Sequence, residues 1–163
     1  MVTTVFDGNK VVFDAMVIIN FHGCRAFESL LDWAPGEIIV PTQVQQEAPE
    51  SDDGLINWNT YITTGAVAVE DIEGAGAENI FYQYYENTIA GKTVHEGEAA
   101  CLALAISQGY GLACDESVIR DEFSRCCPEK ICVSSWMIVN KAVEKGLIDS
   151  DEADGLKKGF FYL

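Results

Sequence analysis

Short hydrophobic runs alternate along the chain with longer segments in which hydrophobic residues recur at helical spacing. The clearest run lies in Lys10–Asn20, where Val11–Phe13 are followed by one acid, Asp14, and then by a second apolar stretch. A hydrophobic, β-branched run closed by an acid is typical of a buried parallel strand that carries a carboxylate at its carboxyl end. We therefore predict the first strand over residues 10–14.

The same patterns predict four further short strands and the helices between them. The expected strands are 37–40, 65–69, 111–114 and 130–133. The expected helical segments are 17–21, 25–33, 42–48, 78–87, 96–108, 116–125, 134–145 and 149–159, with an apolar element at 58–62, polar loops at 49–54 and 88–95, and an edge strand or arm at 2–6. Strands that alternate with helices predict an α/β fold with a mainly parallel sheet of about five strands, in one domain over residues 1–163.

Composition is that of an ordinary globular domain, with 48% hydrophobic and 22% charged residues. No run of eighteen apolar residues exists, so we expect no membrane span. The first residues lack a basic segment followed by an apolar core, so we expect no secretory signal and a cytoplasmic protein with reduced cysteines. The spacing of Cys126, Cys127 and Cys132 matches no recognised zinc-ligand pattern.

The net charge of −16, from 26 acids and 10 bases, excludes a protein that holds nucleic acid by a broad basic surface. It is compatible with a cluster of carboxylates that binds a cation, and with a basic partner. Most of the acids are expected simply to lie on a solvated surface.

Four acids are expected to converge at one edge of the sheet. Asp14 and Asp115 each close a predicted strand, and parallel strands end at the same edge. Glu47 and Glu98 lie on the predicted helices that border this edge. Such a cluster suits Mg²⁺ or Mn²⁺, which prefer oxygen ligands, and a bound ion activates water for phosphodiester hydrolysis. The two histidines, neither in a triad-like context, agree with a reaction that needs no side-chain nucleophile.

Four segments carry these acids in a recognisable order: VVFDAMVIINF, IIVPTQVQQEA, HEGEAACLALA and LACDESVIRDEF. In these segments the chain resembles PIN-domain proteins, specifically the VapC-like toxin branch of prokaryotic toxin–antitoxin modules. The segments span residue 11 to about residue 125, and the strand–helix pattern downstream fits as far as residue 158.

The resemblance implies a three-layer α/β/α sandwich and an acidic metal site formed by Asp14, Glu47, Glu98 and Asp115. It also implies dependence on Mg²⁺ or Mn²⁺ and endonucleolytic cleavage of RNA. A protein antitoxin would inhibit such a ribonuclease, and a homodimer would be usual.

The chain departs from the family pattern at two positions. Met16 stands where a serine or threonine is common, and Val118 stands where many members have a further acid or asparagine. Glu116 or Asp121 could substitute as a metal ligand, although Asp121 could equally pair with Arg125 on a helix surface.

Two other residues allow alternative interpretations. Glu98 could bind a metal or stabilise the amino-terminal end of its helix. Asn20 could orient a site carboxylate without binding the metal itself, or it could merely end a turn. The aromatic segment 81–85 could stack bases, although at helical spacing it is more often core or a dimer face.

The sequence bears on three other functions. Met16 and the acidic surface also fit a catalytically inactive PIN-fold protein that binds or regulates. A phosphohydrolase with Asp14 as covalent nucleophile is disfavoured because Met16 replaces the second aspartate such enzymes use. A doubly wound nucleotide-binding protein is disfavoured because no glycine-rich loop follows the first strand.

Overall fold

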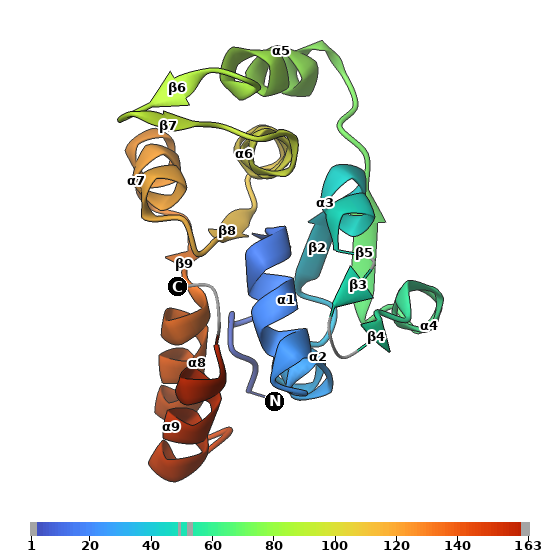
Figure 1. Cartoon of the computed structure of the whole chain (residues 1–163), viewed down its shortest axis with the longest axis vertical. Helices are drawn as coiled ribbons and strands as arrows, with labels where there is room; N and C mark the ends of the chain where they lie inside the picture. Colours follow the sequence, from blue (N-terminus) through green and yellow to red (C-terminus); the bar gives the residue numbers. More distant parts are fainter. Residues whose placement is uncertain (1–2, 49, 52–53, 161–163) are drawn as a thin grey trace.

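The centre of the molecule is a five-stranded parallel sheet (Figure 1), seen in a computed structural model that describes residues 3–48, 50–51 and 54–160. Its strands are β1 (Val11–Phe13), β2 (Ile38–Pro41), β5 (Val67–Glu70), β8 (Gly111–Ala113) and β9 (Cys132–Val133). They lie in the order β5-β2-β1-β8-β9, and every neighbouring pair is parallel. The five strands predicted from hydrophobic runs are confirmed, with ends that differ by one or two residues.

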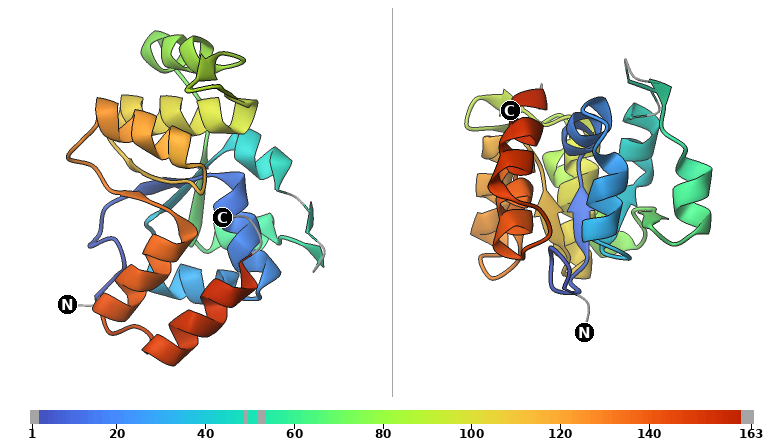
Figure 2. Two further views of the ribbon diagram at one scale, coloured as in Figure 1. Left: turned by 60° about the vertical axis from the view of Figure 1, so that its left-hand side comes forward. Right: turned by 90° about the horizontal axis from the view of Figure 1, so that it is seen from below.

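Helices cover both faces of the sheet, which confirms the α/β/α arrangement (Figures 1 and 2). They are α1 (Ala15–Gly23), α2 (Phe27–Trp33), α3 (Thr42–Glu47), α4 (Trp58–Thr63), α5 (Ala75–Tyr84), α6 (Glu96–Gln108), α7 (Ser117–Cys126), α8 (Ser135–Glu144) and α9 (Ser150–Gly159). Helix α6 packs on β1, β2 and β8, and α7 packs on β8 and β9. Helices α1, α2 and α8 lie on the opposite face, and α5 lies outside α6.

Several predicted segments were wrong in extent or type. Helix α1 is a nine-residue helix rather than a single turn, because most of its sides are buried between the sheet, α2 and α8. Helix α3 begins at Thr42, where the predicted segment begins, and the Thr42 side chain donates to Asp71. The described part of residues 2–6 forms no strand; Val5 and Phe6 are buried, and the Val5 N–H donates to Trp33 O at 2.8 Å.

Two segments expected to be loops contain short antiparallel hairpins. One joins β3 (Glu50–Ser51) to β4 (Gly54–Leu55), and the other joins β6 (Thr88–Ile89) to β7 (Lys92–Thr93). Strands of two residues are too short to show an alternating pattern, so the sequence could not reveal them. Residues 1–2, 49, 52–53 and 161–163 lie outside the described residues. The predictions for the segments 2–6 and 49–54 therefore apply in part to residues that the structure does not describe.

The aromatic segment at 81–85 belongs mainly to the core, as the commoner interpretation expected. Tyr84 is buried and donates its hydroxyl hydrogen to Glu122, while Phe81 stacks on Tyr85 with ring centroids 5.2 Å apart. Tyr82 alone of these rings is largely exposed, at 70%.

All six cysteines are free of disulfides. None of the helices in the described ranges is long and apolar enough to cross a membrane.

The strand order creates one position suited to a ligand. The chain moves from β1 to β2 and β5 on one side, and later to β8 and β9 on the other. In open α/β sheets, ligands bind beyond the carboxyl ends of the strands at such a reversal. The reversal here lies between β1 and β8, whose carboxyl ends lead to Asp14 and Asp115.

Strand β8 packs so tightly between β1 and β9 that there is no room for a side chain at Gly111. A Cβ atom at Gly111 would lie 2.8 Å from Ile131 O and 3.2 Å from Val11 Cγ2. Because a backbone oxygen cannot yield easily, Gly111→Ala should lower the free energy of unfolding by about 1–3 kcal/mol in urea denaturation. The control is Gly155→Ala in exposed α9, which has open space at Cβ and should stabilise by about 0.5–1 kcal/mol. Equal effects of the two substitutions would contradict the packing argument.

Candidate acidic site

Asp14 is buried at the carboxyl end of β1, where it immediately precedes α1 and is only 4% exposed. Its backbone N–H donates to Ala113 O at 2.9 Å, which continues the pairing of β1 with β8. The carboxylate faces two buried thiols: Cys114 Sγ lies 3.6 Å from Oδ2 and Cys101 Sγ lies 3.9 Å from Oδ1. Thiols are weak donors, so they stabilise a buried carboxylate poorly.

The environment of Asp14 raises its pKa from 3.8 to about 7. Burial is the largest cause, and the neighbouring negative charge of Glu98 adds to it. The N–H of Ala15 lowers the pKa, and Glu47 raises it again. Ionised Asp14 therefore needs a positive charge nearby, because burial and like charges both disfavour a carboxylate.

Asp115 follows β8 by two residues and is held by three strong donors. Asn20 Nδ2 donates to its Oδ2 at 2.7 Å, and Ser135 donates its backbone N–H to Oδ1 at 2.7 Å and its hydroxyl hydrogen to Oδ2 at 2.6 Å. Asn20 is 2% exposed and Ser135 is fully buried. The carboxylate therefore has a defined orientation, set by α1 and by the first residue of α8.

Glu98 combines two interactions at the amino-terminal end of α6. Its Oε1 accepts the backbone N–H of His95 at 3.0 Å, which stabilises the start of the helix. The same oxygen lies 3.1 Å from Lys92 Nζ, and Lys92 also approaches Glu116 Oε2 at 3.9 Å. Lys92 comes from the unpredicted β6–β7 hairpin and places one positive charge among these acids.

Glu47 lies apart from this group, at the end of α3. Its Oε1 accepts the backbone N–H of Gly97 at 2.9 Å. A Cβ atom at residue 97 would lie 2.5 Å from Glu47 Oε2, so glycine leaves the room that this carboxylate occupies. Burial raises the pKa of Glu47 and the Gly97 N–H lowers it, while Glu96 and Glu98 raise it further.

One pocket of about 340 Å³ unites most of the predicted residues. It is lined by Asp14, Met16, Lys92, His95, Glu98, Asp115 and Glu116. Two predicted acids are outside the lining: Glu47, which acts on Asp14 through its charge, and Asp121, which is exposed on α7. The alternative pairing of Asp121 with Arg125 is wrong, since Arg125 binds both carboxylate oxygens of Glu122 instead.

The donor chemistry of this pocket fits a hard divalent cation, although the side chains are not gathered tightly. In the described residues, no three His, Cys, Asp or Glu side chains are close enough to hold one metal ion. The acids nevertheless supply oxygen ligands, and buried Asp14 has few donors of its own. Binding one ion through three carboxylates therefore requires side-chain movement, for which Lys92 would have to release Glu98.

Sequence reasoning missed three contributors to the site. Ser135 lies at the start of the predicted helical segment 134–145, where nothing in the sequence sets it apart from the N-cap residue Ser134. Gly97 stands in a run of acids and alanines without any local turn signal. Lys92 lies in the segment 88–95 that was expected to be a polar loop, because the hairpin that carries it has no sequence pattern.

The raised pKa of Asp14 predicts how stability depends on pH in the absence of divalent ions. The folded-state pKa exceeds the unfolded value, so the contribution of Asp14 to stability is fully present below about pH 4 and is lost as pH rises through about 7. Asp14→Asn removes the ionisable carboxyl group and therefore removes this loss of stability at high pH. Relative to the parent, the variant should gain roughly 2–4 kcal/mol in free energy of unfolding between pH 4.5 and pH 8, measured by urea denaturation with EDTA. A difference independent of pH would refute the assignment.

The causes of the raised pKa give a second test. Replacing Glu98 by Gln should lower the pKa of Asp14, and Glu47→Gln should lower it less, because Glu98 contributes more. Glu116→Gln serves as the control and should leave the pKa of Asp14 nearly unchanged. Carboxyl ¹³C NMR titration of the three variants measures the order directly, and a larger shift in Glu116→Gln would contradict it.

Comparison with known proteins agrees with this fold. A family model described as a PIN domain matches residues 10–156. No curated protein and no solved structure matches the chain. Because the family match spans most of the 163 residues, the chain belongs to the PIN-domain family, a nuclease fold whose members commonly use divalent metals.

Proposed function

We propose that the protein is a metal-dependent endoribonuclease, the toxin of a VapC-like toxin–antitoxin pair. The observation that carries the proposal is buried Asp14, whose pKa is raised to about 7 by burial and by Glu98, in one pocket with Asp115. A buried acid in an acidic pocket is costly to a protein that has no use for it. Its place at the strand reversal of a PIN fold supports a role in phosphodiester hydrolysis.

The residues that would hold Mg²⁺ or Mn²⁺ are Asp14, Glu98 and Asp115. Two further acids, Glu47 and Glu116, lie beside them. When bound, such an ion stabilises charge on the phosphate and lowers the pKa of a water molecule. Asn20 and Ser135 keep Asp115 in one orientation through their hydrogen bonds. Orienting partners of this kind typically contribute about 10–100-fold to metal affinity or activity.

Substrate RNA must approach a chain with a net charge of −16. Lys92 on the β6–β7 hairpin lines the acidic pocket, and Arg120 on α7 lines a second hollow that shares Asp115. These two positive charges flank the acids where a phosphate would enter. Binding is therefore expected to weaken steeply with salt and to depend on the metal.

The toxin role rests on the VapC-like order of the acidic segments. An antitoxin with a basic segment would complement the acidic surface, and cytoplasmic homodimers belong to the same proposal.

The decisive test is cleavage of single-stranded RNA by the purified protein with Mg²⁺ or Mn²⁺. Asp14→Asn should lower the rate by about 100-fold or more, since groups that merely orient a ligand contribute up to about that factor. The matched control is Asp121→Asn on the exposed surface of α7, which should cleave at a rate within about twofold of the parent. EDTA should abolish cleavage, and equal rates for Asp14→Asn and the parent would refute the proposal.

A second candidate function is that of a PIN-fold binding protein without activity. Met16 lines the pocket at the position where a serine or threonine is common in the family pattern, and Lys92 is paired with Glu98. Calorimetric titration with Mn²⁺ separates the candidates: heat that disappears in Asp14→Asn and Asp115→Asn favours the nuclease, and no such binding favours the inactive protein.

A further inference from the structure

We propose that a second hollow beside the acidic pocket binds one unpaired nucleotide of an RNA strand, with its base against Trp136 and its phosphate beside Arg120. This inference rests on the proposed ribonuclease function and specifies how its substrate is held.

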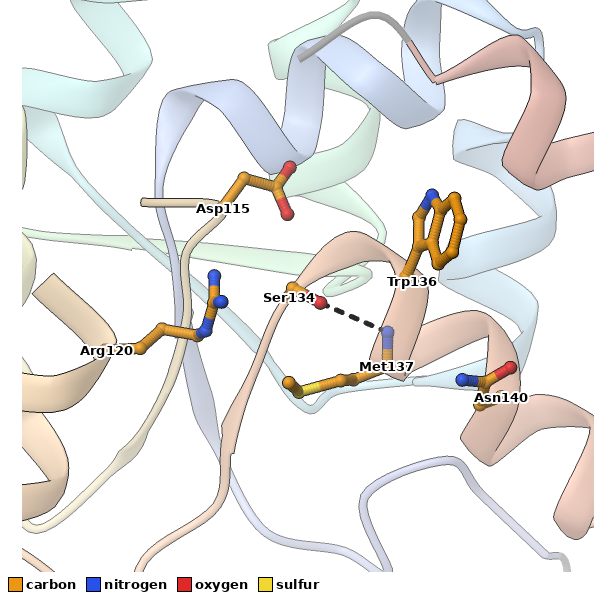
Figure 3. Close-up of a pocket in the computed structure, with 6 residues that line it drawn as sticks. All are labelled: Asp115, Arg120, Ser134, Trp136, Met137 and Asn140. Atoms are coloured by element: carbon orange, nitrogen blue, oxygen red, sulfur yellow. Dashed lines mark hydrogen bonds between the residues drawn. The ribbon is translucent and has the colours of Figure 1, made fainter. Parts of the chain in front are cut away.

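The hollow has a volume of about 460 Å³ and adjoins the acidic pocket at Asp115, which lines both. Its other lining residues come from α7 and from the start of α8: Arg120, Ser134, Trp136, Met137 and Asn140. Figure 3 shows Arg120 on one side and Trp136 on the opposite side, with Asp115 between them at one edge. A strand whose phosphate lies at the acidic pocket would therefore place a neighbouring nucleotide here.

Trp136 is unusual among the tryptophans because its indole is exposed. It is 45% exposed, whereas Trp33 and Trp58 are 5% and 8% exposed. Met137 next to it is 43% exposed, so the hollow has a water-facing apolar surface. Exposed aromatic rings beside a basic group are the usual platform for unpaired bases, because every base has a face that can stack.

Arg120 supplies the positive charge on the other side. Its Nη1 donates to Cys114 O at 2.8 Å, which fixes the side chain on the strand that leads to Asp115. Within the described ranges it forms no ion pair with an acid, although the chain has 26 acids and 10 bases. A guanidinium has five N–H donors, so Arg120 keeps donors for a phosphate. By contrast, Arg125 on the same helix is bound to Glu122.

A second cation lies over one face of the indole. Lys157 Nζ lies 5.4 Å from the centroid of the Trp136 ring, and it donates to Asn140 Oδ1. Lys157 does not line the hollow, so Arg120 supplies the positive charge of its lining, and a base would stack on the face of the indole that Lys157 leaves open. Ser134 and the Asn140 amide add polar groups that can meet the edge of a base.

The binding test uses the full chain with a fluorescein-labelled RNA pentamer in Ca²⁺, with a gel to verify that the RNA stays intact. Trp136→Ala should raise the Kd from fluorescence anisotropy by about 5- to 100-fold, the range for losing one stacked base. Trp136→Phe keeps a ring and should stay within about threefold of the parent. Tyr82→Ala removes the exposed ring on α5 and should change nothing, and thermal unfolding verifies that each variant is folded.

The phosphate contact has its own readout. Arg120→Gln should reduce the slope of log Kd against log salt concentration by about 0.7, the value for one phosphate contact with a single strand. Arg125→Gln is the matched control and should leave the slope unchanged. A purely structural role of Arg120 would raise Kd without changing the slope, and this result would overturn its assignment.

The outcome separates this inference from the proposed function. Binding that weakens in Trp136→Ala supports the hollow even if the parent fails to cleave RNA, a failure that would count against the ribonuclease alone. Equal Kd for Trp136→Ala and the parent overturns the hollow even if the parent cleaves RNA. No measurable RNA binding by the parent, or an equal loss in Tyr82→Ala, also overturns it.

Discussion

Burial of the Asp14 carboxylate is the constraint on which the rest of the site depends. The side chain lies at the carboxyl end of the central strand, faces two thiols, and is near the charges of Glu98 and Glu47. These surroundings raise its pKa to about 7, so the ionised form is costly without a cation. This buried acid in the acidic pocket of a PIN-domain chain is the basis of the proposal that a divalent ion binds there.

The two acids at the strand ends are supported in different ways. Asp115 accepts hydrogen bonds from Asn20 and Ser135 and therefore has a fixed orientation. Among the described residues, the hydrogen-bond donors near the Asp14 carboxylate are two thiols and the backbone N–H of Ala15. The pair thus combines one carboxylate with a fixed orientation and one carboxylate whose negative charge is poorly compensated.

Positive charge is scarce in this chain, and its location is informative. Lys92 reaches the acids from the β6–β7 hairpin, while Arg120 lines the neighbouring hollow with Trp136, and Lys157 lies over the Trp136 ring. The net charge of −16 would repel RNA from most of the surface. Local cations beside the acidic pocket offer a way for a phosphate chain to approach at this one edge.

The sequence alone determined the elements and the edge at which the site lies. Hydrophobic runs closed by Asp14 and Asp115 predicted two parallel strands with their acids at one end, because such patterns are local and parallel strands share a direction. Only the tertiary structure decided which partners surround those acids. Asn20 and Asp115 are 95 residues apart, and their contact depends on how α1 packs beside β8. The position of Lys92 among the acids was likewise decided by the tertiary structure, because its hairpin is too short to leave a sequence pattern. Contacts between distant segments are set by packing rather than by local propensity.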